Sequence, residues 1–150
     1  MSDPRETIVV GTDGSKESQF AVRWAAGLAA KLGARVILIF AFEPLAELEK
    51  TPAPKAPVDF PAIRERHRHE LENDWARPLA LAGIEFKTRL VEDTPTEALV
   101  AAAVEHDATL VVIGSHGSSG WRDLILGSVA TALPTQLGRP VVIVPSRGAN

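Results

Sequence analysis

Two glycine-rich segments carry the residue types and spacing in this sequence that could do chemistry. The first covers residues 11–15 (GTDGS) and the second covers residues 114–120 (GSHGSSG). Glycine has no Cβ atom, so a glycine-rich backbone can approach a phosphate group closely. Successive backbone N–H groups in such a turn can also bind an anion. Both segments are therefore candidates for contact with a phosphorylated ligand.

The second segment leads toward a predicted helix start. Gly114, Gly117, Gly127 and Ser128 together form the pattern Gly-x2-Gly-x9-Gly-Ser. The first N–H groups of a helix favour a bound anion, and the Ser128 hydroxyl lies at the same place. Ordinary turns and helix caps use these residue types too, so the pattern alone leaves open both a phosphate site and plain loop structure.

Asp13, the acidic residue of the first segment, has three candidate roles. It can cap a turn or helix, accept a hydrogen bond from a ribose hydroxyl, or help to hold a phosphate-bound Mg²⁺. If Asp13 shares a site with the second segment, the strands that precede the two segments must be neighbours. This requirement predicts the strand order 3-2-1-4-5.

The elements that must position these segments follow from the hydrophobic pattern. Strands are predicted at 7–12, 35–42, 84–91, 109–113 and 141–144, and helices at 16–32, 62–82, 96–105 and 128–137. Strands that alternate with helices imply right-handed parallel crossovers. The predicted fold class is α/β. A single domain over residues 1–150 contains one doubly wound, parallel, five-stranded sheet of the Rossmann-like type with helices on both faces.

Proline interrupts this pattern at residues 43–61, where five of the eleven prolines lie. Because proline removes a backbone donor and restricts the preceding residue, we expect neither helix nor strand there, but a Pro-rich mobile loop. Pro78 is expected to kink or split the helix at 62–82. The three tryptophans, Trp24, Trp75 and Trp121, are predicted to be packing residues.

Composition argues against several classes of function. The 150 residues contain no cysteine and carry a net charge of −3, which excludes thiolate chemistry and disfavours nucleic acid as a partner. No apolar run is long enough to span a membrane and no signal-peptide layout is present, so we expect a cytoplasmic location. No metal site is predicted, because His67 and His69 do not share a helix face.

Strong phosphoryl-transfer catalysis is also not expected. The signature of P-loop nucleotide hydrolases, Gly-x4-Gly-Lys-Ser/Thr, does not occur in the sequence, so a protein of that class is not expected. Efficient phosphoryl transfer needs groups that neutralise the charge of the transferred phosphoryl group and that position a nucleophile. Few candidates lie near the glycine-rich segments: Asp13, Lys16, His116 and Arg122. No catalytic residue is therefore assigned, and at most slow ATP hydrolysis is expected.

The run 8–15 (IVVGTDGS) and the complete Gly-x2-Gly-x9-Gly-Ser motif resemble the ATP-binding subclass of the universal stress protein family over almost the whole chain. The resemblance implies ATP as ligand, either alone or with Mg²⁺ bound through its phosphates. It implies that Asp13 meets the ribose or phosphate region. Gly114, Gly117, Gly127 and Ser128 would contact ribose and phosphates, and Thr12, Ala41, Ile113 and Val129 would line the nucleoside pocket.

The same resemblance implies a homodimer in which the last strands, residues 141–144, pair antiparallel. The residues themselves support pairing, because an apolar edge strand is a liability unless it is paired or covered. The function expected is therefore a homodimeric, nucleotide-dependent binding and regulatory module of the stress response. Two alternatives remain open for the same pocket: a slow ATPase or phosphotransferase, and a sensor that prefers AMP or cyclic AMP.

Overall fold

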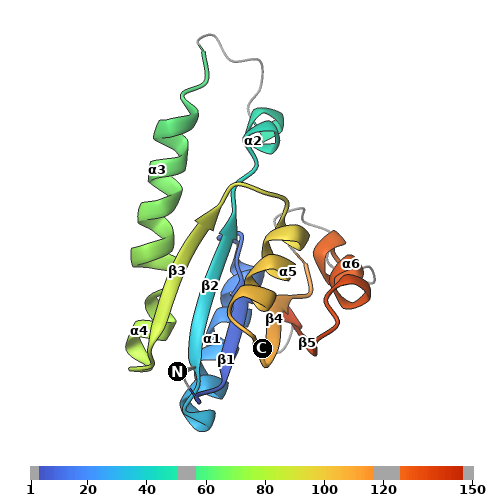
Figure 1. The fold of residues 1–150 in the computed structure, drawn as a ribbon. Coiled ribbons are helices and arrows are strands. Elements are labelled where there is room, and N and C mark those ends of the chain that lie inside the picture. The colour runs from blue at the N-terminus through green and yellow to red at the C-terminus, as the bar shows by residue number, and fades with distance from the viewer. Residues whose placement is uncertain (1–3, 51–56, 117–125, 147–150) are drawn as a thin grey trace.

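One parallel sheet of five strands organises the protein, in the order β3-β2-β1-β4-β5 (Figure 1). The computed structural model describes residues 4–50, 57–116 and 126–146. The strands are β1 Thr7–Gly11, β2 Arg35–Ala41, β3 Phe86–Val91, β4 Leu110–Gly114 and β5 Val141–Val144. All four pairings are parallel. The predicted fold class and strand order are confirmed.

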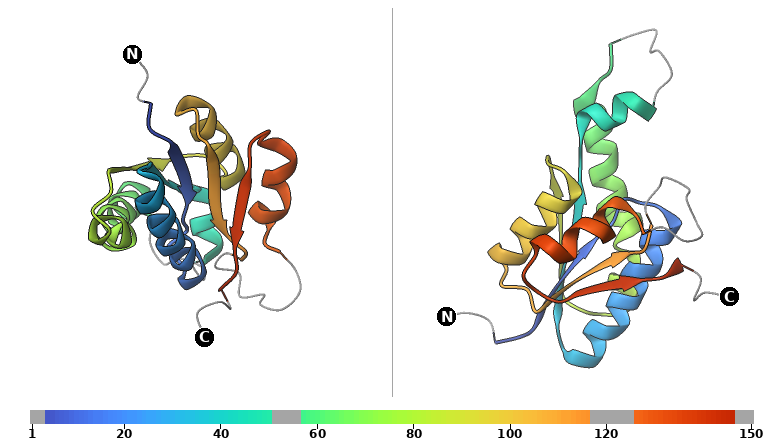
Figure 2. Two further views of the ribbon diagram at one scale, coloured as in Figure 1. Left: turned by 90° about the horizontal axis from the view of Figure 1, so that it is seen from below. Right: turned by 90° about the vertical axis from the view of Figure 1, so that its right-hand side faces the viewer.

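Helices cover both faces of this sheet. They are α1 Lys16–Leu32, α2 Pro44–Lys50, α3 Phe60–Glu70, α4 Arg77–Leu81, α5 Pro95–Glu105 and α6 Ser128–Gln136, with a π-helical turn, η1 Leu71–Trp75, between α3 and α4. One buried core joins α1, η1 and α4 to the sheet, and a second joins α5 and α6 to its other face. Figure 2 shows α1 and α5 on opposite sides of the strands.

Alternate residues of the central strands contribute side chains to one core or the other. Ile8 and Val10 of β1 lie in the first core, whereas Val9 between them lies in the second. The period of two along a strand explains this division, because successive side chains point to opposite faces. Exposure along β3 alternates instead between half-buried and exposed side chains, as predicted for an edge strand with one open face.

Helix caps occur where the sequence indicates them. The Ser15 hydroxyl accepts a hydrogen bond from the Ser18 N–H at 3.2 Å at the start of α1. The Thr94 hydroxyl accepts one from the Glu97 N–H at 3.3 Å at the start of α5. Each cap satisfies a backbone donor that has no partner inside its helix, so the start of each helix is fixed relative to the strand before it.

The prediction that residues 43–61 contain no helix is wrong at both ends of that segment. Residues 44–50 form α2, and α3 begins at Phe60 with the Asp59 carboxylate accepting a hydrogen bond from the Ala62 N–H. Proline is tolerated in the first turn of a helix, where its missing N–H would have no partner anyway. Pro44 and Pro61 occupy such positions, and the mobility of the segment stays a prediction.

The helix predicted at 62–82 is divided, as Pro78 suggested, but the departure from α-helical geometry begins earlier. The Ala76 N–H donates to the Leu71 carbonyl at 3.1 Å, which is the i→i+5 pattern of a π-turn. Pro78 then lies in the first turn of α4. The π-turn buries both Leu71 and Trp75, so the prediction that Trp75 is a packing residue is confirmed.

Candidate functional site

A cavity of about 300 Å³ lies at the carboxyl ends of β1, β2 and β4. In a doubly wound sheet this is the switch point, where successive connections pass to opposite faces and leave a crevice. The chain leaves β1 for α1 on one face and leaves β4 for α6 on the other. The starts of α5 and α6 and one side of α2 complete the walls of the cavity.

Eight of the nine residues predicted to bind a ligand line this one cavity, and Gly117 lies outside the described residues. The first glycine-rich segment, the end of β2 and the end of β4 each contribute, together with the start of α6. The eight are Thr12, Asp13, Ala41, Ile113, Gly114, Gly127, Ser128 and Val129. The structure therefore brings together positions that are up to 117 residues apart in the chain (from Thr12 to Val129), while their contacts with a ligand stay a prediction.

A backbone hydrogen bond joins the two parts of the Gly-x2-Gly-x9-Gly-Ser motif. The Gly127 N–H donates to the Ser115 carbonyl at 2.9 Å, and the Ser115 N–H donates to the Val144 carbonyl of β5 at 3.0 Å. Gly127 is the N-cap residue of α6 and supplies no side-chain cap. The start of α6 thus faces the cavity without a capping side chain, which suits an anionic group there.

Asp13 and Thr12 have structural roles in the first segment. The Asp13 carboxylate accepts a hydrogen bond from the Ser15 N–H at 2.9 Å, so the turn-capping role considered for this residue is present. The Gly14 N–H donates to the buried Thr12 hydroxyl at 3.2 Å, and that hydroxyl is 3.0 Å from the Ser18 hydroxyl. These bonds hold the Asp13 carboxylate at the edge of the cavity.

Gly114 is needed for packing as well as for the cavity wall. A Cβ atom at this position would lie 3.1 Å from the Glu17 carbonyl oxygen of α1. That oxygen belongs to helix backbone and cannot rotate away, so a larger residue would push α1 from the end of β4. The close approach of α1 to β4 therefore depends on the bare backbone at Gly114.

His116 also lines the cavity. Its Nδ1 atom lies 3.0 Å from the Ser115 hydroxyl oxygen. Its Nε2 atom is buried and has no hydrogen-bond partner within the described ranges. Buried polar atoms usually have a partner, so this nitrogen is a candidate for contact with a ligand.

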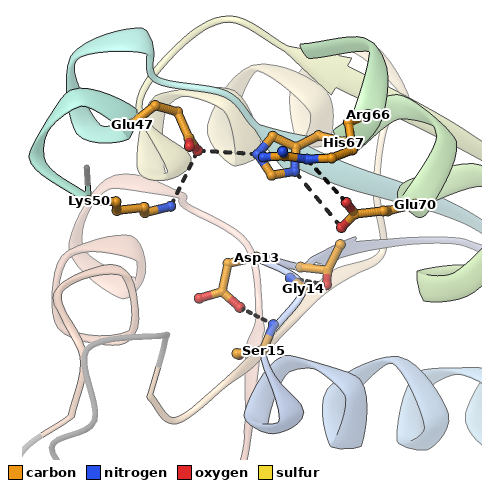
Figure 3. A network of polar contacts seen from close by, with 9 residues as sticks. Asp13, Gly14, Ser15, Glu47, Lys50, Arg66, His67 and Glu70 are labelled. Carbon is orange, nitrogen blue, oxygen red and sulfur yellow. Dashed lines mark hydrogen bonds and ion pairs between the residues drawn. The ribbon is translucent and has the colours of Figure 1, made fainter. Parts of the chain in front are cut away.

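Sequence reasoning missed the wall that α2 supplies. Ala46, Glu47 and Lys50 of α2 line the cavity, although the sequence predicted an irregular loop there. The available signal was the run of good helix formers that follows Pro44. Figure 3 shows Glu47 and Lys50 on one side, with Asp13 and Ser15 on the other.

The described part of the chain shows neither a metal cluster nor a membrane span. No group of three or more His, Cys, Asp or Glu side chains in residues 4–50, 57–116 and 126–146 is arranged to hold a metal ion. Within the same ranges, no helix has the length and apolar character needed to cross a bilayer.

The fold and the cavity define a doubly wound α/β protein with a ligand crevice at its switch point. The model of the universal stress protein family matches residues 4–145. The chain therefore belongs to the universal stress protein family.

Three similar proteins place the chain within that family. A universal stress protein of Thermus aquaticus is 29% identical over 140 residues, which cover 93% of this chain and 98% of the relative. A universal stress protein of Mycobacterium tuberculosis is 31% identical over 149 residues, covering 95% of this chain and 47% of the relative. The chain thus spans about half the length of the mycobacterial relative.

The third is a crystal structure of a universal stress protein in complex with cAMP. It is 30% identical to this chain, with a TM-score of 0.66, and the likeness covers 96% of this chain and 99% of the other. The same fold therefore extends over nearly the full length of both proteins.

Gly14 offers a test of how tightly the first segment is packed. Its φ is +80°, and a Cβ atom would lie 2.4 Å from Cζ2 of the Trp75 ring. Trp75 cannot easily move away, because its side chain is buried and its ring centroid lies 5.2 Å from that of Phe40. The turn that holds Asp13 is therefore supported directly by the π-helical turn.

We expect Gly14→Ala to lower the free energy of unfolding by about 2–4 kcal/mol, since left-handed backbone strain adds to overlap with the indole. Gly33→Ala is the matched control. Gly33 also has a positive φ, of +65°, but open space around its Cβ position, so its cost should be about 1 kcal/mol. Urea unfolding followed by circular dichroism measures both, and equal costs would show that Trp75 does not support the turn.

Proposed function

We propose that this protein binds an adenine nucleotide, with ATP as its ligand, in the cavity at the switch point. One observation carries the proposal. The first glycine-rich segment and the described part of the second, both chosen from the sequence for phosphate contact, line a single cavity that also has an apolar wall. A nucleotide has the matching division into a flat apolar base and a charged phosphate group.

The cavity offers suitable surroundings for each part of a nucleotide. Ile39, Ala41 and Ile113 give an apolar wall that suits the base, since ligand pockets combine apolar walls with a few polar groups. Asp13 can accept hydrogen bonds from ribose hydroxyls. The start of α6, at Gly127 and Ser128, suits the phosphates because its N–H groups favour negative charge. Mg²⁺, where present, would enter with the phosphates.

The structure of a universal stress protein with cAMP supports the class of ligand, because that protein is 30% identical to this chain over nearly the full length of both. The choice of ATP rests on the complete Gly-x2-Gly-x9-Gly-Ser motif. Competition titration calorimetry with ATP, AMP and cAMP separates the three. We expect ATP to compete most strongly. A clear preference for AMP or cAMP would show that the preferred nucleotide, and not ATP, is the ligand.

Binding rather than rapid turnover is the activity that the cavity supports. Fast phosphoryl transfer needs cations that neutralise the transferred group and a positioned nucleophile. The described cavity-lining residues include one lysine, Lys50, and no arginine, and the Lys50 ammonium lies 3.3 Å from the Glu47 carboxylate. We infer a cytoplasmic module that responds to nucleotide, with at most slow hydrolysis.

Gly127→Val tests the position of the phosphates. Gly127 has a φ of −61° and a ψ of 167°, which valine can adopt, so the fold should be kept while the new side chain fills the phosphate end of the cavity. We expect the affinity for ATP to fall by at least about 100-fold, the loss of several contacts at once. Isothermal titration calorimetry provides the measurement.

Gly27→Val is the matched control for this substitution. Gly27 lies in α1 with nothing within 4 Å of its Cβ position, so valine there should leave both fold and affinity unchanged. If the Gly127→Val protein is folded and binds ATP as tightly as the parent protein, the phosphates lie elsewhere.

We propose further that the protein forms a homodimer through β5. This strand is at the edge of the sheet, and Val141, Val142 and Ile143 are only half-buried. Beside it lies a groove formed by Phe20, Arg23 and Trp24 of α1 together with residues 142–145. Trp24, predicted to be a packing residue, is 43% exposed. An unpaired apolar edge with an exposed tryptophan beside it favours pairing with a second copy.

Val142→Glu should convert the dimer into a monomer, because two carboxylates would face the paired strands near the two-fold axis. Leu90→Glu is the matched control. Leu90 is a half-buried apolar residue of β3, the opposite edge strand, so its replacement should cost similar stability without changing the oligomeric state. Light scattering coupled to size-exclusion chromatography gives the mass, and an unchanged dimer for Val142→Glu would contradict pairing through β5.

A further inference from the structure

Helix α2 lines the ligand cavity, yet apolar packing does little to hold it there. None of its residues is buried, and its two leucines, Leu45 and Leu48, are 75% and 36% exposed. Most helical stability in proteins comes from packing of an apolar face. A short helix without such a face needs another contact to keep its position.

A hydrogen bond between Glu47 and His67 supplies this contact. Nε2 of His67 lies 3.2 Å from Oε1 of Glu47, and the two side chains are only 14% and 12% exposed. An ionised carboxylate can only accept hydrogen bonds, so Nε2 of His67 carries the proton and donates it. The Lys50 ammonium lies 3.3 Å from the same carboxylate oxygen. Figure 3 shows this arrangement across the cavity from Asp13.

His67 is itself held by rigid elements. Its ring centroid lies 5.0 Å from that of Phe40 and 6.0 Å from that of Phe42, both on the sheet side. It also lies 6.0 Å from the centroid of Trp75 in the π-helical turn. Because aromatic contacts fix the imidazole on three sides, its Nε2 atom presents a donor at a fixed place, and Glu47 meets that donor.

We propose that His67 is a positioning residue that fastens α2 over the ligand cavity through Glu47, so that nucleotide affinity depends on this contact. This inference rests on the proposed function and adds a positioning residue to the same site. His67 is not among the residues that line the cavity; it acts through Glu47, which is.

Charged side chains of α2 and α3 face His67. From α2 it faces Glu47, with Lys50 beyond. From α3 it faces Glu70, whose Oε2 lies 4.0 Å from Nδ1 of His67, with Arg66 beyond at 3.6 Å from that carboxylate. The sheet side and the π-helical turn present the rings of Phe40, Phe42 and Trp75 to it.

Nε2 is the ring atom through which His67 can hold α2. Nδ1 of His67 has no hydrogen-bond partner among the described residues. A variant that keeps a donor at the place of Nε2 should therefore keep the contact with Glu47, and a variant without a donor should lose it.

Titration calorimetry with ATP measures how far this contact supports binding. We expect His67→Leu to bind ATP about fivefold less tightly than the parent protein, which corresponds to the loss of one hydrogen bond that holds a wall of the cavity.

Two further variants separate positioning from other causes. His67→Gln keeps an N–H donor, so it should restore much of the affinity that His67→Leu loses. His69→Gln, an exposed histidine on the same helix, should behave like the parent protein.

Two results would overturn the inference. If His67→Leu binds ATP as tightly as the parent protein, α2 is not held in place by His67. If His67→Gln binds no more tightly than His67→Leu, the loss does not come from the missing donor. Hydrogen–deuterium exchange of residues 44–50 without ligand adds an independent measure, and exchange should quicken in His67→Leu and slow again in His67→Gln. Failure of the parent protein to bind any adenine nucleotide would instead overturn the proposed function itself.

Discussion

The parallel pairing of β1 with β4 is the constraint on which the cavity depends. Ile8 pairs with Leu110, Val9 with Val111 and Val10 with Val112, and the side chains of Val9 and Val10 are fully buried on opposite faces of the sheet. A slip of one residue would send each side chain to the wrong face. The apolar cores therefore fix the register of these two strands, and the register fixes where the two glycine-rich segments meet.

Backbone hydrogen bonds then extend this order beyond the strands. The Thr12 N–H donates to the Ile39 carbonyl of β2 at 2.9 Å, and the Ser115 N–H donates to the Val144 carbonyl of β5. Each loop thus begins as a short continuation of the sheet. Glycines have no side chain that could hold them in place by packing. In this arrangement, backbone hydrogen bonds restrain the chain around Gly114 and Gly127 instead.

The predictable part of the molecule is the part with strong hydrophobic periodicity. The five strands and most of the helices follow from alternating or continuous apolar runs. The strand order follows from the requirement that the two glycine-rich segments share a site, and eight cavity-lining residues follow from the glycine pattern and the resemblance it carries. Helix α2 was missed because it has no buried face, so it leaves no periodic signal, and the prolines that follow it dominate the local composition.

The π-helical turn was missed for a different reason. Nothing in the local sequence of residues 71–75 demands an i→i+5 bond, which is rare and costly compared with an α-helical one. The turn is favoured by tertiary packing, since it buries Leu71 and Trp75 together. Trp24 shows the converse case, because a helical apolar pattern predicts burial while the side chain is 43% exposed in the single chain.

Trp75 connects both sides of the candidate site through direct contacts. Its indole lies against the backbone of Gly14, next to Asp13, and it packs against Phe40, which lines the cavity, and against His67, which bonds to α2. The π-helical turn η1 thus supports the turn at Asp13 and Gly14 on one side of the site. Through His67 it also supports the weakly packed helix α2 on the other side. Elements with few buried contacts open at the lowest free energy, so α2, which has no buried residue, is the wall of the cavity that can move with the least disturbance of the core.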